Sequence, residues 1–220
     1  MSQQSLFDAR TPADNAQLVH AHPFAWLVSS DDAAHGGALH ATPLPLRAQC
    51  DAQGHIVRVV GHMARRNPQV AALMRQPQAM FLFLGPHGYV SPSWMDDRTQ
   101  APTWNYASVR CHAVLHFHED ESRLRKEVRD LVDAHEAGRD KRWSVDDMGA
   151  RYDSLSRGII GFEARVSEVL GKFKLGQDER PDVFSDIVHA LATAPPVADA
   201  PPHDSLLGWM LRFNTPPSDR

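Results

Sequence analysis

The sequence predicts a mainly β protein with helices on its outside, built as a small antiparallel barrel. About six or seven segments have the alternating or continuously apolar pattern of strands. Helices are inserted only at intervals, and no strand–helix–strand repeat of the doubly wound kind is present. The clearest strand, residues 106–118, alternates between small or apolar side chains and mostly polar ones, which indicates one buried face.

In the first part of the chain, helix and strand patterns follow one another between turn residues. Thr11-Pro12 predicts the start of a short helix, and the apolar run at 24–30 predicts a strand. Residues 39–46 alternate well enough for a second strand. Pro43 and Pro45 cannot donate ladder hydrogen bonds, so this strand should lie at a sheet edge or contain a bulge.

The next stretch is the predicted functional centre. Residues 56–63 indicate a strand that ends in a Gly-His-Met turn, before two arginines and a helix. Asn67 is a good N-cap, and Pro68 suits the first helical position because no N–H there needs a partner. Arg65 and Arg66 therefore precede a helix N-terminus, where guanidinium groups, free N–H groups and the helix dipole favour anions. This predicts a phosphate site, although such a pair is more often a solvated turn.

The second half of the chain predicts further strands, helices and a tail. The run 79–85 is apolar on both faces and should form a central strand. The remaining predicted elements are a helix at 119–138, helical residues at 145–156, a strand at 158–171, a polar loop at 172–177 and a helix at 182–192. Residues 1–193 are predicted as the binding domain and 194–220 as a proline-rich tail. Its apolar segment 205–213 could dock on its own chain or on a partner subunit.

Composition limits the function classes. The chain has 220 residues and a formal net charge of −4, whereas autonomous DNA-binding proteins usually carry a basic stripe. Cys50 and Cys111 form no CxxC motif, so neither a disulfide framework nor a structural zinc site is expected. No run resembles a signal peptide or a membrane span, which predicts a cytoplasmic protein.

Two further stretches carry candidate ligand-binding side chains. Residues 91–106 combine tryptophans with hydroxyl and amide groups, which suits a planar heteroaromatic ligand. The alternative is that these tryptophans close the end of the barrel. Lys172 and Lys174 lie on the same side of an extended segment and could face one anion, although exposed lysines are common in turns.

The thirteen histidines raise the question of a metal. His112 and His116 share a strand face but would be roughly 13 Å apart, too far to bind one zinc ion. No metal site is therefore predicted. His62, inside the proposed ligand turn, could serve as a single ligand to haem iron. No nucleophile motif, P-loop or GxGxxG is present, so catalysis would depend on a cofactor, and no catalytic residue is assigned.

Five motifs in order resemble the PaiB family, whose members are described as FMN-binding negative transcriptional regulators. They are GHMARRNPQ (61–69), GPHGYVSPSW (85–94), PTWNY (102–106), GIIGFEARV (158–166) and GKFKLGQ (171–177). The match extends from about residue 23 to residue 191. The resemblance implies a split antiparallel β-barrel related to pyridoxamine-phosphate-oxidase-like flavin proteins, normally a homodimer with the cofactor between subunits.

The resemblance also implies the cofactor-binding residues. The FMN phosphate would lie at the strand-to-helix turn, and the flavin ring near the tryptophans. The implied set is His62, Met63, Arg65, Arg66, Asn67, Trp94, Thr103, Trp104, Asn105, Lys172, Lys174 and Gln177. Haem-dependent piperazate synthases have a similar sequence pattern, and for them His62 would be the axial ligand to haem b.

These observations predict an FMN-binding regulator of PaiB type that acts through flavin binding or indirectly. DNA binding is left open. The alternative is an enzyme on the same fold, either a flavin oxidoreductase or a haem-dependent enzyme that forms N–N bonds. A third possibility is a module that binds its ligand without chemistry.

Overall fold

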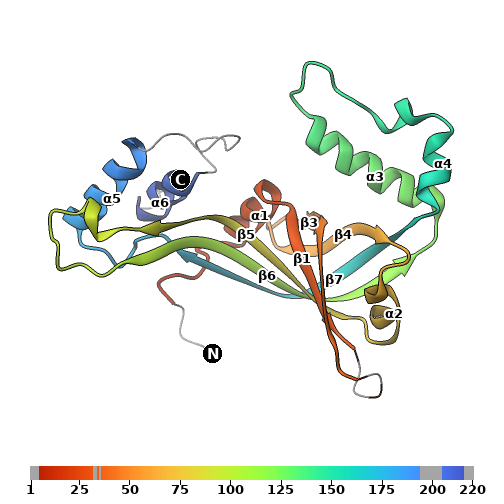
Figure 1. Ribbon diagram of the computed structural model, residues 1–220, viewed down its shortest axis with the longest axis horizontal. Coiled ribbons are helices and arrows are strands. Elements are labelled where there is room, and N and C mark those ends of the chain that lie inside the picture. Colours follow the sequence, from red (N-terminus) through yellow and green to blue (C-terminus); the bar gives the residue numbers. More distant parts are fainter. Residues whose placement is uncertain (1–4, 32–33, 35, 194–204, 216–220) are drawn as a thin grey trace. The chain divides into compact units, whose positions relative to one another are not determined.

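The computed structural model describes residues 5–31, 34, 36–193 and 205–215, and these residues contain seven strands and six α-helices (Figure 1). The strands are β1 (Phe24–Ser30), β2 (Leu39–Pro45), β3 (Arg47–Cys50), β4 (Ile56–Ala64), β5 (Gln78–Val90), β6 (Thr103–His118) and β7 (Ile159–Lys174). The helices are α1 (Pro12–Ala21), α2 (Pro68–Arg75), α3 (Glu121–Glu136), α4 (Arg151–Ser156), α5 (Pro181–Thr193) and α6 (Leu206–Asn214), with short 3-10 turns η2 (Pro92–Trp94) and η3 (Val145–Met148). The predicted proline-rich linker at 194–204 lies outside the described residues.

The strands form one sheet in the order β2-β1-β5-β6-β7-β4-β3, which confirms the predicted mainly β, split-barrel class. The edge position of β2 is also confirmed: Pro43 pairs with Trp26 and Pro45 with Phe24 of β1. β5 lies between β1 and β6, as its apolar sequence predicts. One face of β5 is nevertheless open in the single chain, since Leu84 is 53% exposed.

The predicted Gly-His-Met turn is wrong, because these residues continue β4 as far as Ala64. β7 pairs with β4 without interruption from Arg58 opposite Arg165 to Ala64 opposite Ile159, and this pairing keeps the backbone extended. The helix that follows starts as predicted. The Asn67 side chain accepts a hydrogen bond from the backbone N–H of Gln69 at 2.9 Å.

The chain divides into two compact units, which are described separately. Unit 1 comprises the described residues of 1–10, 84–109 and 170–220, and unit 2 those of 11–83 and 110–169. Strands β5, β6 and β7 contribute residues to both units. The predicted domain boundary at residues 193 and 194 falls at the limit of the described residues and stays a prediction.

In unit 1, helices α5 and α6 lie side by side (Figure 1). Phe173 of β7 stacks on Trp209 and Phe213 of α6, with ring centroids 5.7 and 4.7 Å apart. The apolar C-terminal segment therefore docks on its own chain, which is one of the two predicted alternatives. β7 runs on to Lys174, so the predicted loop at 172–177 is wrong in its first half.

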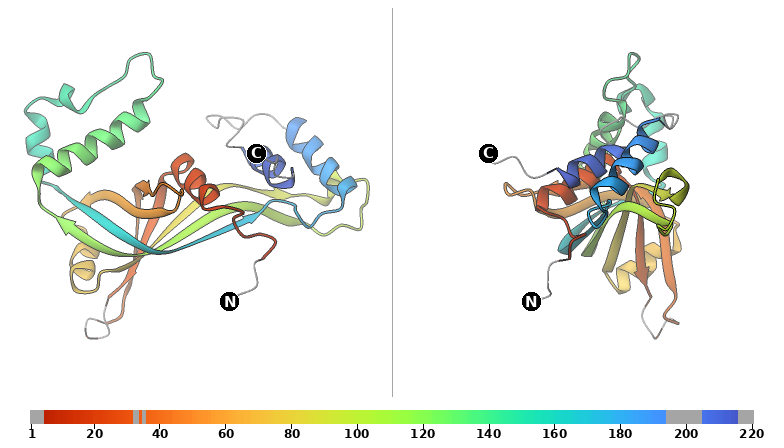
Figure 2. Two further views of the ribbon diagram at one scale, coloured as in Figure 1. Left: turned by 180° about the vertical axis from the view of Figure 1, so that it is seen from behind. Right: turned by 90° about the vertical axis from the view of Figure 1, so that its left-hand side faces the viewer.

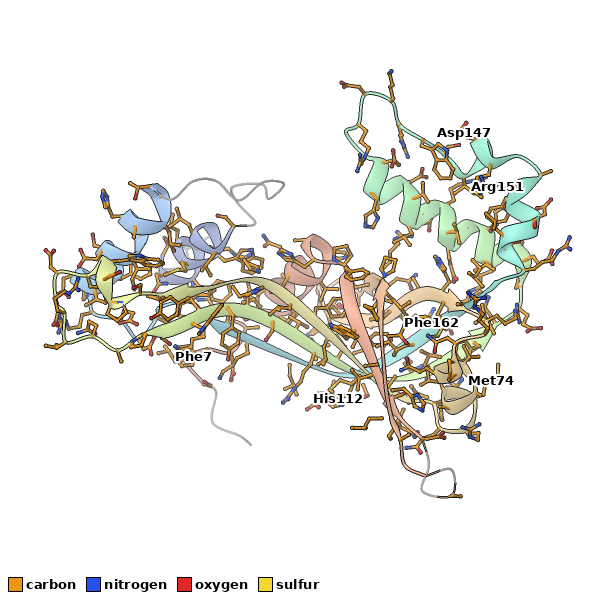
Figure 3. The ribbon with its side chains drawn as sticks, viewed as in Figure 1. Phe7, Met74, His112, Asp147, Arg151 and Phe162 are labelled. Carbon is orange, nitrogen blue, oxygen red and sulfur yellow. The ribbon has the colours of Figure 1, made fainter. Side chains whose placement is uncertain are left out.

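In unit 2, α3 and α4 lie on the same side of β4 and β7, and the view from behind shows the same arrangement (Figures 1 and 2). The core of this unit contains Leu27, Phe81, Leu115 and Phe162, each at most 1% exposed. Figure 3 labels Phe162 within β7 and Met74 on α2. Leu124 is the buried residue of α3, whereas Glu121, Lys126 and Arg129 are exposed, so the predicted amphipathic helix is confirmed.

Candidate functional site

Three arginines meet where the β4–β7 ladder ends. The backbone N–H of Arg65 donates to the carbonyl of Gly158 at 2.9 Å, so the residues just after β4 lie beside those just before β7. The Arg65 guanidinium donates to Glu119 at 2.5 Å and to the carbonyl of Ile159 at 3.3 Å. Within the part of the chain that the structure describes, the exposed side chains of Arg66 and Arg157 form no hydrogen bond or ion pair. Unpaired guanidinium groups leave this edge of the sheet able to bind an anion.

The other predicted residues of this motif have different surroundings. Both ends of the Asn67 amide make structural hydrogen bonds, because its oxygen caps α2 and its nitrogen donates to the Thr42 hydroxyl at 3.0 Å. Met63 is 2% exposed and belongs to the core. His62 lies on the opposite face of β4 from Met63, as alternation along a strand requires. Burial lowers the pKa of His62, which favours its neutral form.

Next to Arg65 is a cavity of about 590 Å³. Its walls come from the end of β4, the end of β6, the first turns of α3, and α4. The lining residues are Arg65, His118, Glu119, Glu121, Leu124, Arg125, Tyr152, Asp153, Ser156 and Arg157. Its charged lining consists of arginines and carboxylates, and its volume is in the range of small-molecule sites.

One wall of the cavity is a histidine fixed by a carboxylate. His118 Nε2 and Glu127 Oε2 are 2.9 Å apart, and the two side chains are only 12% and 13% exposed. Arg123 holds Glu127 in turn at 2.9 Å and also reaches Glu163 at 2.6 Å. Gly161 makes room for this pair, because a Cβ built there would lie 2.5 Å from the His118 ring. A carboxylate that accepts from Nε2 leaves Nδ1 as the acceptor of the neutral imidazole.

The aromatic candidates lie in unit 1. Trp104 is 54% exposed and its ring centroid is 6.3 Å from that of His87 and 6.1 Å from that of Tyr89. Lys174 donates to the Thr103 hydroxyl and, at 3.4 Å, to the carbonyl of Trp104. An exposed indole beside an ammonium group could stack on a planar, electron-poor ring. His87 and Tyr89 did not stand out in the sequence, although they alternate on one face of β5 with Gly88 between them.

Four other predicted residues of unit 1 have structural contacts. Asn105 is 1% exposed, and its amide nitrogen lies 3.6 Å from the sulfur of Met210 in α6. Gln177 accepts from the N–H of Leu175 and donates to the carbonyl of Phe173, which closes the turn after β7. Lys172 donates to Ser5 rather than sharing a partner with Lys174, and Trp94 is 36% exposed in η2. Their roles as cofactor ligands stay predictions.

The unit 2 edge fits the phosphate of a flavin mononucleotide. The Arg66 guanidinium has no partner among the residues that the structure describes, and the partner of Arg65, Glu119, is 72% exposed, so a phosphate could replace Glu119 at small cost. For haem, the lowered pKa of His62 favours the neutral imidazole that an axial ligand requires, although His62 does not line the cavity. No three metal-ligating side chains in the described ranges are close enough to form a metal site. No helix among these residues has the length and apolar character needed to cross a bilayer.

Comparison with solved structures identifies the fold class of this protein. The chain shares its fold with the flavocytochrome Anf3 of Azotobacter vinelandii, at a TM-score of 0.55 and 16% identity over 91% of this chain and 89% of that chain. It also shares its fold with the FAD and haem binding protein of Mycobacterium smegmatis, at a TM-score of 0.54 and 17% identity over 89% and 94%. These values establish the fold alone, and they agree with the split-barrel class described above.

The family follows from the sequence itself. The chain belongs to the family described as "Putative FMN-binding domain", whose model matches residues 1–168. It is 28% identical over 134 residues to the Protease synthase and sporulation protein PAI 2 of Bacillus subtilis, covering 60% of this chain and 64% of that relative. The predicted PaiB resemblance and FMN as the family's cofactor are thereby confirmed.

Proposed function

We propose that this protein is an FMN-binding regulator of PaiB type, in which Arg65 and Arg66 bind the cofactor phosphate. The observation that carries this proposal is the open guanidinium of Arg66, directly before the α2 N-terminus capped by Asn67. Family membership supplies the identity of the ligand. When bound, FMN would supply redox chemistry. The residues of this chain would hold its phosphate and screen its charge.

The test of the phosphate site is an FMN titration followed by flavin fluorescence. The double variant Arg65→Ala with Arg66→Ala should bind FMN about 2 to 4 kcal/mol more weakly, because charge-assisted hydrogen bonds contribute about 1.5 to 3 kcal/mol each and do not add fully. Arg151→Ala is the matched control, since Arg151 is exposed and forms no ion pair among the described residues. Unchanged affinity in a folded double variant would remove these arginines from the site.

A second copy of the chain is the partner we propose for the open sheet face. Phe24 and Trp26 of β1 are 65% and 50% exposed, and Leu82 of β5, opposite Trp26 in the register, is 36% exposed. Large apolar side chains gathered on one face indicate an interface. Sedimentation velocity should show a dimer for the wild type and a monomer for Trp26→Glu. A monomeric wild type would contradict the proposal.

Regulation would act through flavin binding or indirectly. The net charge of −4 does not suit tight autonomous DNA binding, which depends on neutralising phosphates. A gel-shift assay of the pure protein at physiological salt should show no tight, sequence-specific complex. Such a complex would show that the protein reads DNA directly.

Enzymatic activity is the alternative function. NAD(P)H oxidation by the FMN-loaded protein would identify a flavin oxidoreductase. The lowered pKa of the half-buried His62 and the haem bound by the Mycobacterium smegmatis neighbour support haem b as the second candidate cofactor. A Soret band that appears with haemin and disappears in His62→Ala would establish that alternative, and a band that persists in the variant would reject His62 as the ligand.

A further inference from the structure

The unit 2 cavity contains charges of both signs that lack partners. Glu121 and Arg157 line the cavity, and their side chains form no hydrogen bond or ion pair among the described residues. The remaining charged groups are weakly engaged, because Arg65 is paired with an exposed Glu119 and Arg125 lies 3.6 Å from an exposed Asp153. Pairs of this kind contribute little in the absence of a ligand and exchange easily.

Two buried polar groups of the lining also lack partners. Tyr152 is 6% exposed, and its hydroxyl has no hydrogen-bond partner in the described part of the chain. The Arg125 guanidinium covers its ring at 4.2 Å from the centroid. His118 Nδ1 is likewise buried and unpartnered, while Glu127 fixes its other ring nitrogen. Both atoms are closed off from solvent, so the groups that a ligand in the cavity can reach are the exposed charges of Glu121 and Arg157.

We propose that this cavity binds a small zwitterion, with the ligand carboxylate on Arg157 and its ammonium group on Glu121. The three lining arginines are balanced by three lining carboxylates, so neither a simple anion nor a simple cation matches the lining. A guanidinium fork binds a carboxylate bidentately, and a lone carboxylate binds an ammonium group. The site goes beyond FMN binding, since Arg66 does not line this cavity and neither Arg157 nor Glu121 belongs to the proposed phosphate site.

The experiment is a thermal-shift screen of the FMN-free protein with the L-amino acids, taurine and glycine betaine. Isothermal titration calorimetry then compares the best amino acid with its N-acetyl and carboxamide derivatives, which each remove one charge. Both derivatives should bind at least tenfold more weakly, since each removes one of the two charge-assisted contacts on which the proposed binding depends. No binding by any zwitterion, or equal binding by either derivative, would overturn the proposal.

The variants separate this site from the phosphate site. Arg157→Gln should bind the amino acid at least tenfold more weakly and no longer discriminate against the carboxamide, and Glu121→Gln should no longer discriminate against the N-acetyl form. Arg151→Gln is the control, because Arg151 lies at the start of the same helix α4 (Figure 3) but does not line the cavity. Arg157→Gln should bind FMN normally, and Arg66→Ala should bind the amino acid normally. Competition between FMN and the amino acid would assign the cavity to the cofactor and overturn the proposal.

Discussion

Replacing Gly161 by alanine tests the arrangement of the cavity wall. A Cβ at this position would lie 2.5 Å from His118 Cε1, 2.6 Å from His118 Nε2 and 3.2 Å from Glu127 Oε2. Side-chain contacts shorter than 3.0 Å are not tolerated, so the imidazole must move away from β7. Because its Nε2 is the atom bound to Glu127, this movement breaks the 2.9 Å hydrogen bond.

The expected cost follows from these two effects. Inserting a methyl group into a packed site costs about 1 to 3 kcal/mol, and a hydrogen bond to a charged group is worth about 1.5 to 3 kcal/mol. Two effects reduce this cost. Alanine stabilises a strand interior by about 0.5 to 1 kcal/mol relative to glycine, and the neighbouring groups relax in part. The free energy of unfolding of Gly161→Ala should therefore fall by about 2 to 4 kcal/mol.

Urea unfolding followed by circular dichroism measures this change, and a double-mutant cycle identifies its cause. In the His118→Ala background the clash is removed, so adding Gly161→Ala should cost less than about 0.5 kcal/mol. A similar cost in both backgrounds would show that the strand itself, and not the His118–Glu127 pair, requires glycine. A negligible cost of Gly161→Ala alone would refute the reasoning.

Three other predictions concern titration, thiol reactivity and helix docking. Burial lowers the pKa of His62, so its imidazole takes up a proton at a higher pH in the unfolded chain than in the native protein. The contribution of His62 to the free energy of unfolding is therefore complete above about pH 6.5 and decreases as the pH falls through that value. His62→Asn should flatten the pH dependence of the urea midpoint between about pH 7.5 and 5.5, and an equal slope would contradict this assignment. Burial raises the pKa of Cys111 to about 12, so Ellman's reagent should label only the exposed Cys50 in the native protein and both thiols in denaturant. Arg10 donates to the carbonyl of Phe213 and covers its ring at 5.1 Å, so Arg10→Ala should reduce hydrogen-exchange protection in α6 by about 1 to 2 kcal/mol, whereas unchanged protection would show that this contact contributes little.

Local sequence patterns predicted most of the fold because each reflects one buried face. The alternation along 106–118 and the capping signal at Asn67-Pro68 both depend on neighbours in sequence, and both are confirmed. The four residues of β3 are too few to show a period, so this strand was not predicted. β5 continues beyond the predicted strand at 79–85 as far as Val90, through Pro86 and Gly88, because pairing with distant strands overrides local preference.

The candidate site could be predicted only in part, since it depends on the register between two distant strands. Arg65 and Arg66 stand out because they precede a helix signal, whereas Arg157 is followed only by a strand. The antiparallel register that places Ala64 opposite Ile159 brings Arg157 to the same edge of the sheet. The signal that could have found it is the similar arrangement of two motifs, each an apolar strand with an internal glycine and an arginine just beyond one end. If those strands pair antiparallel, the end of one meets the start of the other, and their arginines must converge on one edge.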